Sequence, residues 1–262
     1  MTVFTRMLTD QRRRWIGFAI GVAAVVLIYL PLYSSVAETD LLGAKLDALP
    51  DAVVQALDFT DVNSAEGYAQ ATIYGLTGMI VILSFAIGTG AWSIAGDEES
   101  GALELTMAHG VDRGSLLRQR AVGLIAMTAI VTGVAGTLVW AVNVGVDLGI
   151  SFSGVLGASL ALAALAVFFG AVSLLVGAFT GRRGLALGIT AVLVVVAYLS
   201  STVLADTSMG GFFEAISPFH WAYGNRPLVN GLDGAGLALL LGLALAFLLV
   251  ADRAFETRDV GV

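Results

Sequence analysis

Cysteine is absent from this chain of 262 residues, and lysine occurs once, as Lys45. Without cysteine there are no disulfides, no thiolate metal sites and no cysteine nucleophile. A P-loop needs a lysine directly before serine or threonine, but Lys45 precedes Leu46, so the chain cannot bind and hydrolyse ATP in that way. The two histidines, His109 and His220, lie outside the long apolar runs, which argues against a haem held by two histidines within a membrane.

Charged residues are also scarce, at 13% of the chain, whereas hydrophobic residues make up 58% and the mean hydropathy is +0.90. Soluble domains of this size are less apolar, so the sequence predicts an all-α polytopic membrane protein. Six apolar runs approach or exceed the roughly 20 residues that a helix needs to cross a bilayer. They cover about 15–33, 71–95, 121–145, 153–179, 184–204 and 234–251. We expect them to form a single transmembrane domain over residues 1–262.

None of the six runs contains a charged residue. Proton- and ion-coupled carriers usually place ionisable side chains at membrane depth, so an autonomous secondary carrier is disfavoured. The sequence also has no His-Glu-x-x-His zinc pattern. We therefore expect no catalytic residue, no cofactor and no metal site in this chain.

The net charge of −7 is concentrated between the first two runs, in residues 34–69. This segment has one base, Lys45, and seven acids: Glu38, Asp40, Asp47, Asp51, Asp58, Asp61 and Glu66. Acid-rich surfaces with little lysine suit very salty water, which indicates a halophilic source. Cation binding by the loop is the alternative, but the acids do not have metal-ligand spacing.

The basic residues predict the orientation in the membrane. Eleven of the 13 lie in the N-terminal segment, the 96–120 segment, the 182–183 turn and the C-terminal tail; Lys45 and Arg226 are the exceptions. We expect the protein to lie in the plasma membrane. The positive-inside rule then predicts that both termini and the 96–120 segment face the cytoplasm. A signal peptide is the competing interpretation of the first run, but no small-residue cleavage site follows it.

Two segments between the runs carry unusual patterns. Residues 96–120, GDEESGALELTMAHGVDRGSLLRQR, predict a short helix, a break at Gly110 and a second helix entering the next run. Leu103 and Met107 are four residues apart, so they share one face of this helix. We expect that face to fill a pocket on a partner; the alternative is that it rests on the membrane surface.

Near the last run, Pro218 and Pro227 forbid a continuous helix. That segment is either re-entrant or an aromatic loop at the headgroups, anchored by Phe212, Phe213, Phe219 and Trp221.

The order of these features resembles the permease subunits of ABC-2 type ATP-binding-cassette transporters over almost the whole chain. The best-matching element is Glu99-Ser-Gly-Ala-Leu-Glu-Leu105, similar to the family's E-x-G-T-L-E-x-L, which leads into Asp112-Arg113. Further matches are Leu49-Pro50 with Glu66-Gly-Tyr68, the Ser217–Trp221 sequence SPFHW, and the tail Phe255–Val260.

The resemblance implies a six-span permease fold of the type V exporter kind, with a cytoplasmic coupling helix and a re-entrant outer segment. It also implies a second permease, identical or homologous, and two copies of a P-loop ATPase that bind ATP and magnesium; nothing points to nucleic acid. The small-residue pair Gly184 and Gly188 would suit a dimer seam or packing within the subunit. The ATPase would dock on a coupling helix made by Glu99, Gly101, Leu103, Glu104, Leu105, Met107 and Arg113. A membrane anchor or sensor that moves no substrate is the alternative, and the substrate stays open.

Overall fold

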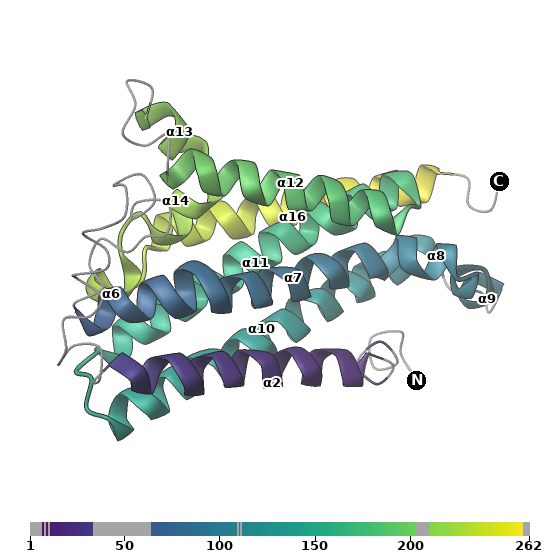
Figure 1. Ribbon diagram of the computed structural model, residues 1–262. Coiled ribbons are helices and arrows are strands. Elements are labelled where there is room, and N and C mark those ends of the chain that lie inside the picture. Colours follow the sequence, from purple (N-terminus) through teal and green to yellow (C-terminus); the bar gives the residue numbers. More distant parts are fainter. Residues whose placement is uncertain are drawn as a thin grey trace.

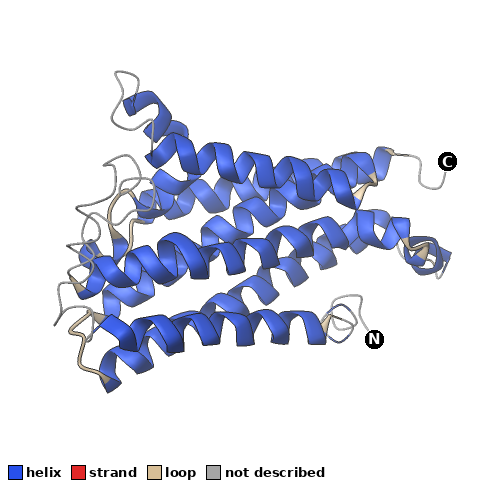
Figure 2. Cartoon of the chain, viewed as in Figure 1, coloured by secondary structure: helices blue, strands red, loops and turns tan. Residues whose placement is uncertain are grey.

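The computed structural model describes Met7, Thr9 and residues 11–33, 64–108, 110, 112–202 and 210–258. Over these residues the regular structure is entirely helical (Figure 2). Most of the predicted acidic loop, His109 and the end of the predicted fifth run lie outside the described residues.

Among the described residues, six helices are long and apolar enough to cross a membrane, which confirms the predicted number (Figure 1). The first is α2 (Arg12–Tyr29) with the 3-10 turn η1 (Leu30–Leu32), and the second runs through α6 (Ala65–Ala69), η2 (Gln70–Leu76), α7 (Thr77–Ala91), η3 (Trp92–Gly96) and α8 (Asp97–Glu99). The others are α10 (Arg113–Gly145), α11 (Phe152–Thr180), α12 (Arg183–Thr202) and α16 (Gly234–Thr257). Four short helices connect them: α9 (Ala102–Ala108), α13 (Gly210–Ile216), α14 (Pro218–Tyr223) and α15 (Pro227–Asn230).

Side-chain caps set several helix ends. Ser64 accepts a hydrogen bond from the backbone N–H of Gly67, so the second spanning helix begins at Ala65, before the predicted start. Asp112 caps α10 in the same way through the N–H of Ser115. These caps satisfy backbone donors that would otherwise have no partner at a helix start.

Helix α11 forms the centre of the bundle, packed against α7, α10, α12 and α16 (Figure 1). Small residues allow this close packing: a Cβ at Gly90 of α7 would collide with the carbonyl oxygen of Gly170 in α11. Nearby, Ser173 donates a hydrogen bond across the same interface to the carbonyl oxygen of Ile87, at 2.9 Å. The contact between α7 and α11 is therefore both close and polar.

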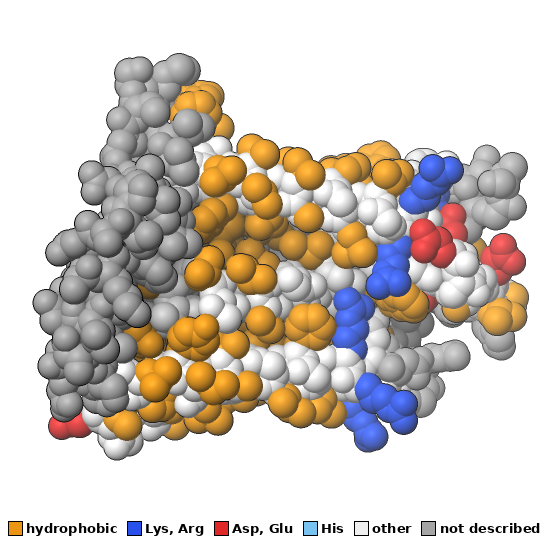
Figure 3. Space-filling view, in the orientation of Figure 1, with side chains coloured by type: hydrophobic (Ala, Val, Ile, Leu, Met, Phe, Trp, Pro, Cys, Tyr) orange, Lys and Arg blue, Asp and Glu red, His pale blue; other side chains and the backbone are white. Residues whose placement is uncertain are grey.

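Most of the charged side chains visible in Figure 3 gather at one end of the bundle, and an acidic side chain is visible at the other end. An apolar belt covers the spanning helices, and a row of basic side chains lies along its edge near the beginnings of α2 and α12. Acidic side chains lie beyond that row, around α8 and α9. The C-terminal end of α16 also lies at this charged end. The N-terminal end of the first spanning helix and the C-terminal end of the last one therefore lie at the same end of the bundle (Figure 1).

Candidate functional site

The segment α8–α9 lies at the charged end, beyond the spanning helices (Figure 1). Helix α8 continues directly from α7 through the π-helical turn η3, so its three acids, Asp97, Glu98 and Glu99, extend a spanning helix. Gly101 then adopts a left-handed conformation with φ of 73°, which few other residues tolerate, and α9 starts in a new direction. Each of the three acids of α8 contacts a different part of the protein.

Asp97 forms an ion pair with Arg120 of α10. The two side chains are only 12% and 10% exposed, so the pair is largely screened from water. A charge buried in this way needs its partner, because the loss of solvation is compensated only by the opposite charge. The pair therefore fixes the end of the second spanning helix to the beginning of the third.

Glu98 forms an ion pair with Arg258, which follows α16 at the end of the described chain. The same guanidinium donates to the carbonyl oxygen of Ala178, at 2.8 Å, near the end of α11. A cation suits this position, because the last carbonyl groups of a helix carry partial negative charge. Arg113 completes the cluster by donating to the backbone oxygen of Arg258, at 2.7 Å.

Glu99 reaches the turn between α11 and α12, where its Oε1 atom accepts a hydrogen bond of 2.8 Å from the backbone N–H of Arg183. A carboxylate here meets the first residue of α12, where the helix dipole favours negative charge. Through its three acids, α8 is thus tied to α10, to the ends of α11 and α16, and to the beginning of α12. We refer to Asp97, Glu98 and Glu99 with their partners Arg120, Arg258 and Arg183 as the α8 hub.

The structure revises the expected docking face of α9. Leu103 is completely buried within the hydrophobic core of the chain, and Met107 packs against that core. The two do share a face, as their spacing predicts, but the face turns toward the protein itself. Glu104 and Leu105 are exposed on the other side, with Leu105 67% accessible. Leu103 is therefore unavailable to a partner, whereas Leu105 is accessible.

Most of the hub was missed by the sequence interpretation, which selected Glu99 but not Asp97, Glu98, Arg120, Arg183 or Arg258. A signal was present: the acidic triplet follows an apolar run directly, and Arg120 comes directly before the next one. Charges that border two adjacent spans lie at the same membrane level, so they can pair. The partner of Glu98 lies 160 residues away and has no such signal.

The opposite end of the bundle contains the predicted outer segment, divided into α13, α14 and α15. Pro218 starts α14 and Pro227 starts α15, at the positions where proline is tolerated in a helix. Phe219 is buried, with its ring 5.3 Å from that of Tyr198 in α12 and 5.8 Å from that of Phe169 in α11.

The remaining predicted aromatic anchors of this segment do not join that cluster. Phe212 is 59% exposed and contacts the ring of Phe213, at 5.8 Å. Trp221 is partly buried, and its indole N–H donates to the carbonyl oxygen of Ala215, at 2.9 Å. Among the described ring–ring contacts, those of Phe219 connect the segment to α11 and α12.

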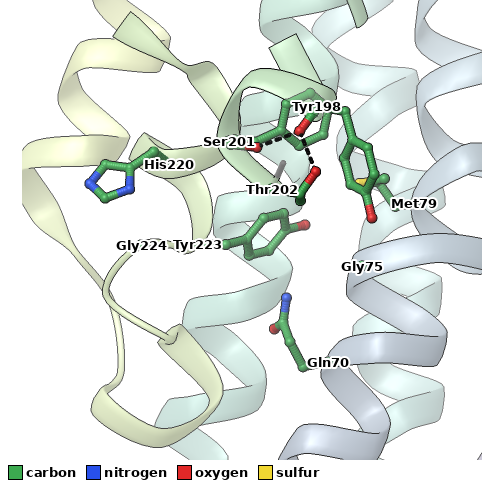
Figure 4. A pocket seen from close by; sticks show the side chains of 10 residues that line it. Gln70, Gly75, Met79, Tyr198, Ser201, Thr202, His220, Tyr223 and Gly224 are labelled. Carbon is green, nitrogen blue, oxygen red and sulfur yellow. Dashed lines mark hydrogen bonds between the residues drawn. The ribbon is translucent and has the colours of Figure 1, made fainter. Parts of the chain in front are cut away.

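A cavity of about 160 Å³ lies beside Phe219, between η2, α12 and α14 (Figure 4). Its wall combines apolar surface with polar side chains and contains no acid, lysine or arginine: Gln70, Gly75, Met79, Tyr198, Ser201, Thr202, Phe219, His220, Tyr223 and Gly224. The hydroxyl groups of Ser201 and Thr202 donate to the backbone oxygen of Tyr198, at 2.9 Å each. The Oε1 atom of Gln70 is buried without a hydrogen-bond partner.

These features define a polytopic helical membrane protein that carries an ion-paired, protruding segment at one end. Among the described residues, no group of three histidine, aspartate or glutamate side chains could hold a metal ion. The chain belongs to the ABC-2 family transporter proteins, whose family model matches residues 1–260. A comparison with curated proteins found no significant match.

Proposed function

We propose that this chain is the membrane-spanning subunit of an ABC exporter, driven by a separate ATPase that docks on α9. Membership of the ABC-2 family supports a transport role. The observation that carries the coupling role is the α8 hub, because it joins the protruding segment to four spanning helices by side-chain contacts. A force applied to α9 would then reach the whole charged end.

The charged end would face the cytoplasm. Arginines dominate the row at the edge of the apolar belt, and basic residues are retained on the cytoplasmic side of membranes (Figure 3). In this orientation α9 extends into the compartment that holds ATP and magnesium, and α13–α15 lie at the outer surface. Both features are needed if the chain is to couple an internal ATPase to export.

The docking surface would consist of the exposed side of α9, with Leu105 as its apolar centre and Glu104 beside it. An exposed leucine that fills a pocket on a partner can dominate such an interface, since a few buried anchors usually provide most of the binding energy. Arg113 would not contribute directly, because its guanidinium is occupied by the backbone oxygen of Arg258. Its role would be to hold the hub together.

The mechanical step would be a rigid-body movement. ATP-dependent closure of two ATPase subunits would displace α9, and the hub would pass that displacement to α10, α11, α12 and α16. A second permease would complete the path. Helix α12 is the least buried of the six spanning helices, and no described residue packed against it lies within 4 Å of a Cβ placed on Gly184 or Gly188. A neighbouring helix could therefore pack closely there.

The outer segment would act as an exit gate. Phe219 fixes α14 between α11 and α12, so a shift of these helices would move the segment with them. The cavity beside it has polar side chains but no acid, lysine or arginine, so it would offer hydrogen bonds to a leaving substrate without requiring a charge. Insertion of a charged pair next to Phe219 should therefore impair transport while the ATPase still binds.

Copurification with the ATPase tests the proposal. Leu105→Asp should leave the permease folded but reduce the amount of ATPase that copurifies by tenfold or more, because truncating or charging an interface anchor commonly costs about 1–3 kcal/mol or more. Val229→Asp is the matched control, since Val229 is 58% exposed on the short helix α15 at the opposite end. Equal ATPase recovery with wild-type and Leu105→Asp protein would exclude docking through this face.

A membrane anchor or sensor is the second candidate, and it would use the same docking surface without moving a substrate. A small molecule that stimulates the ATPase of the purified complex would favour transport. An ion-coupled carrier is supported less, because the six runs that predict the spanning helices contain no aspartate, glutamate, lysine, arginine or histidine.

A further inference from the structure

Two arginines lie along one face of the second spanning helix, at the charged end. The guanidinium of Arg14, from α2, lies directly against Gly88, where a Cβ would collide with it. The guanidinium of Arg183, from α12, lies over the ring of Trp92, with its central carbon 4.7 Å from the ring centroid. Gly88 and Trp92 are four residues apart and so share a face of α7 and its continuation η3. Helices α2 and α12 both pack against this helix.

Neither guanidinium has an acidic partner within the described chain. The ion pairs in the described part of the chain involve other arginines, and Glu99 contacts the backbone N–H of Arg183. The Nε atom of Arg183 is buried and has no hydrogen-bond partner. The two cations also repel each other electrostatically. Half-buried positive charges without a counter-charge are costly, so this arrangement favours an anion.

The depth of the two arginines indicates where that anion comes from. Ile16 follows Arg14 by two residues and Leu185 follows Arg183 by two, and both apolar side chains are exposed, at 36% and 43%. The basic row lies at the border of the apolar belt (Figure 3), which is the level of lipid headgroups. An anion at this level, with apolar side chains beneath it, fits a phospholipid better than a soluble molecule.

We propose that Arg14 and Arg183 bind the phosphate group of an anionic membrane phospholipid, with Trp92 and Gly88 forming the floor of the site. The planar guanidinium presents paired terminal N–H donors that match phosphate oxygens. Stacking on Trp92 holds one guanidinium in place. The absence of a side chain at Gly88 leaves room for the other. The bound phosphate would neutralise the repulsion between α2 and α12 across α7.

Lipid-dependent heat stability of the purified protein in detergent tests this site. Short-chain phosphatidylglycerol should raise the unfolding temperature of the wild type, because a ligand that binds only the folded state stabilises it. Short-chain phosphatidylcholine should do so much less. Arg14→Gln and Arg183→Gln should each weaken the phosphatidylglycerol effect, shifting its half-maximal concentration by at least tenfold. Arg13→Gln and Arg182→Gln are the matched controls, since each alters an exposed neighbouring arginine and should behave like the wild type.

Three results would overturn the proposal. Equal stabilisation by phosphatidylcholine would show that only the acyl chains matter. An equal effect of inorganic phosphate, without a lipid, would assign the site to a soluble anion. Loss of the effect in the control variants as well would show that it comes from general surface charge. If a glutamine variant does not fold, Arg183→Lys keeps the charge but lacks the paired donors, so it should bind phosphatidylglycerol more weakly than the wild type.

Discussion

Removing one member of the buried Asp97–Arg120 pair should destabilise the protein much more than removing an exposed ion pair. The two side chains are 12% and 10% exposed, so Asp97→Ala would leave the Arg120 guanidinium buried without its carboxylate. The Nε atom of Arg120 already has no hydrogen-bond partner in the described part of the chain, so no second contact compensates. Breaking a buried pair in this way typically costs about 3–5 kcal/mol, and we expect a loss of that size.

Denaturant or thermal unfolding of the purified protein would measure the loss. Glu256→Ala is the matched control, because Glu256 and Arg253 are 37% and 85% exposed and such pairs contribute about 0–1 kcal/mol. The double variant Asp97→Leu/Arg120→Met removes both charges and should recover much of the stability. If Asp97→Ala costs no more than Glu256→Ala, burial does not make this pair important and the reasoning is refuted.

Three further predictions follow from burial, close packing and orientation. Leu103→Ala should cost about 2–5 kcal/mol in the same unfolding assay because its side chain is completely buried, whereas Leu105→Ala should stay within about 0.5 kcal/mol; equal losses would contradict the assignment of the two faces of α9. Gly90→Ala should lower the unfolding temperature, because its methyl group would meet a backbone oxygen of α11; an unchanged temperature would show that the helices separate at no cost. A single cysteine at Asp147 should react with a membrane-impermeant thiol reagent added outside cells and one at Ser115 should not; the reverse pattern would overturn the orientation.

The spanning helices could be predicted from the sequence because a charge-free run of sufficient length has few alternatives to a membrane helix. Their ends were harder to predict. The second spanning helix starts at Ala65 because Ser64 caps it, and it includes Glu66, a residue that hydropathy assigns to the loop. At its other end it continues through Asp97–Glu99 because those acids have partners in the folded protein. The π-helical turns η2 and η3 had no recognisable signal.

Two of the three hub contacts could not be predicted from local pattern, since their partners are far apart in the sequence. Glu98 pairs with a residue 160 positions away, and Glu99 with one 84 positions away. The orientation of α9 was open for a related reason. The spacing of Leu103 and Met107 shows that they share a face, but only the packed structure shows that this face turns inward.

Spectroscopic distance measurement on the complex with the ATPase tests the central claim, that α9 and the spanning helices move together. The chain has no cysteine, so single cysteines for spin labels can be introduced at Thr106 on α9, a partly exposed residue outside the proposed docking surface, and at Arg182 beside α12. We expect the distance between them to stay unchanged within one permease when ATP and magnesium are added, while the distance between the two α9 helices of the complex changes. In Arg258→Ala, which loses the contacts to Glu98 and α11, the distances between the labels at positions 106 and 182 should become broadly distributed. If ATP instead moves α9 relative to Arg182 in the wild type, the hub does not transmit the movement and the account is wrong.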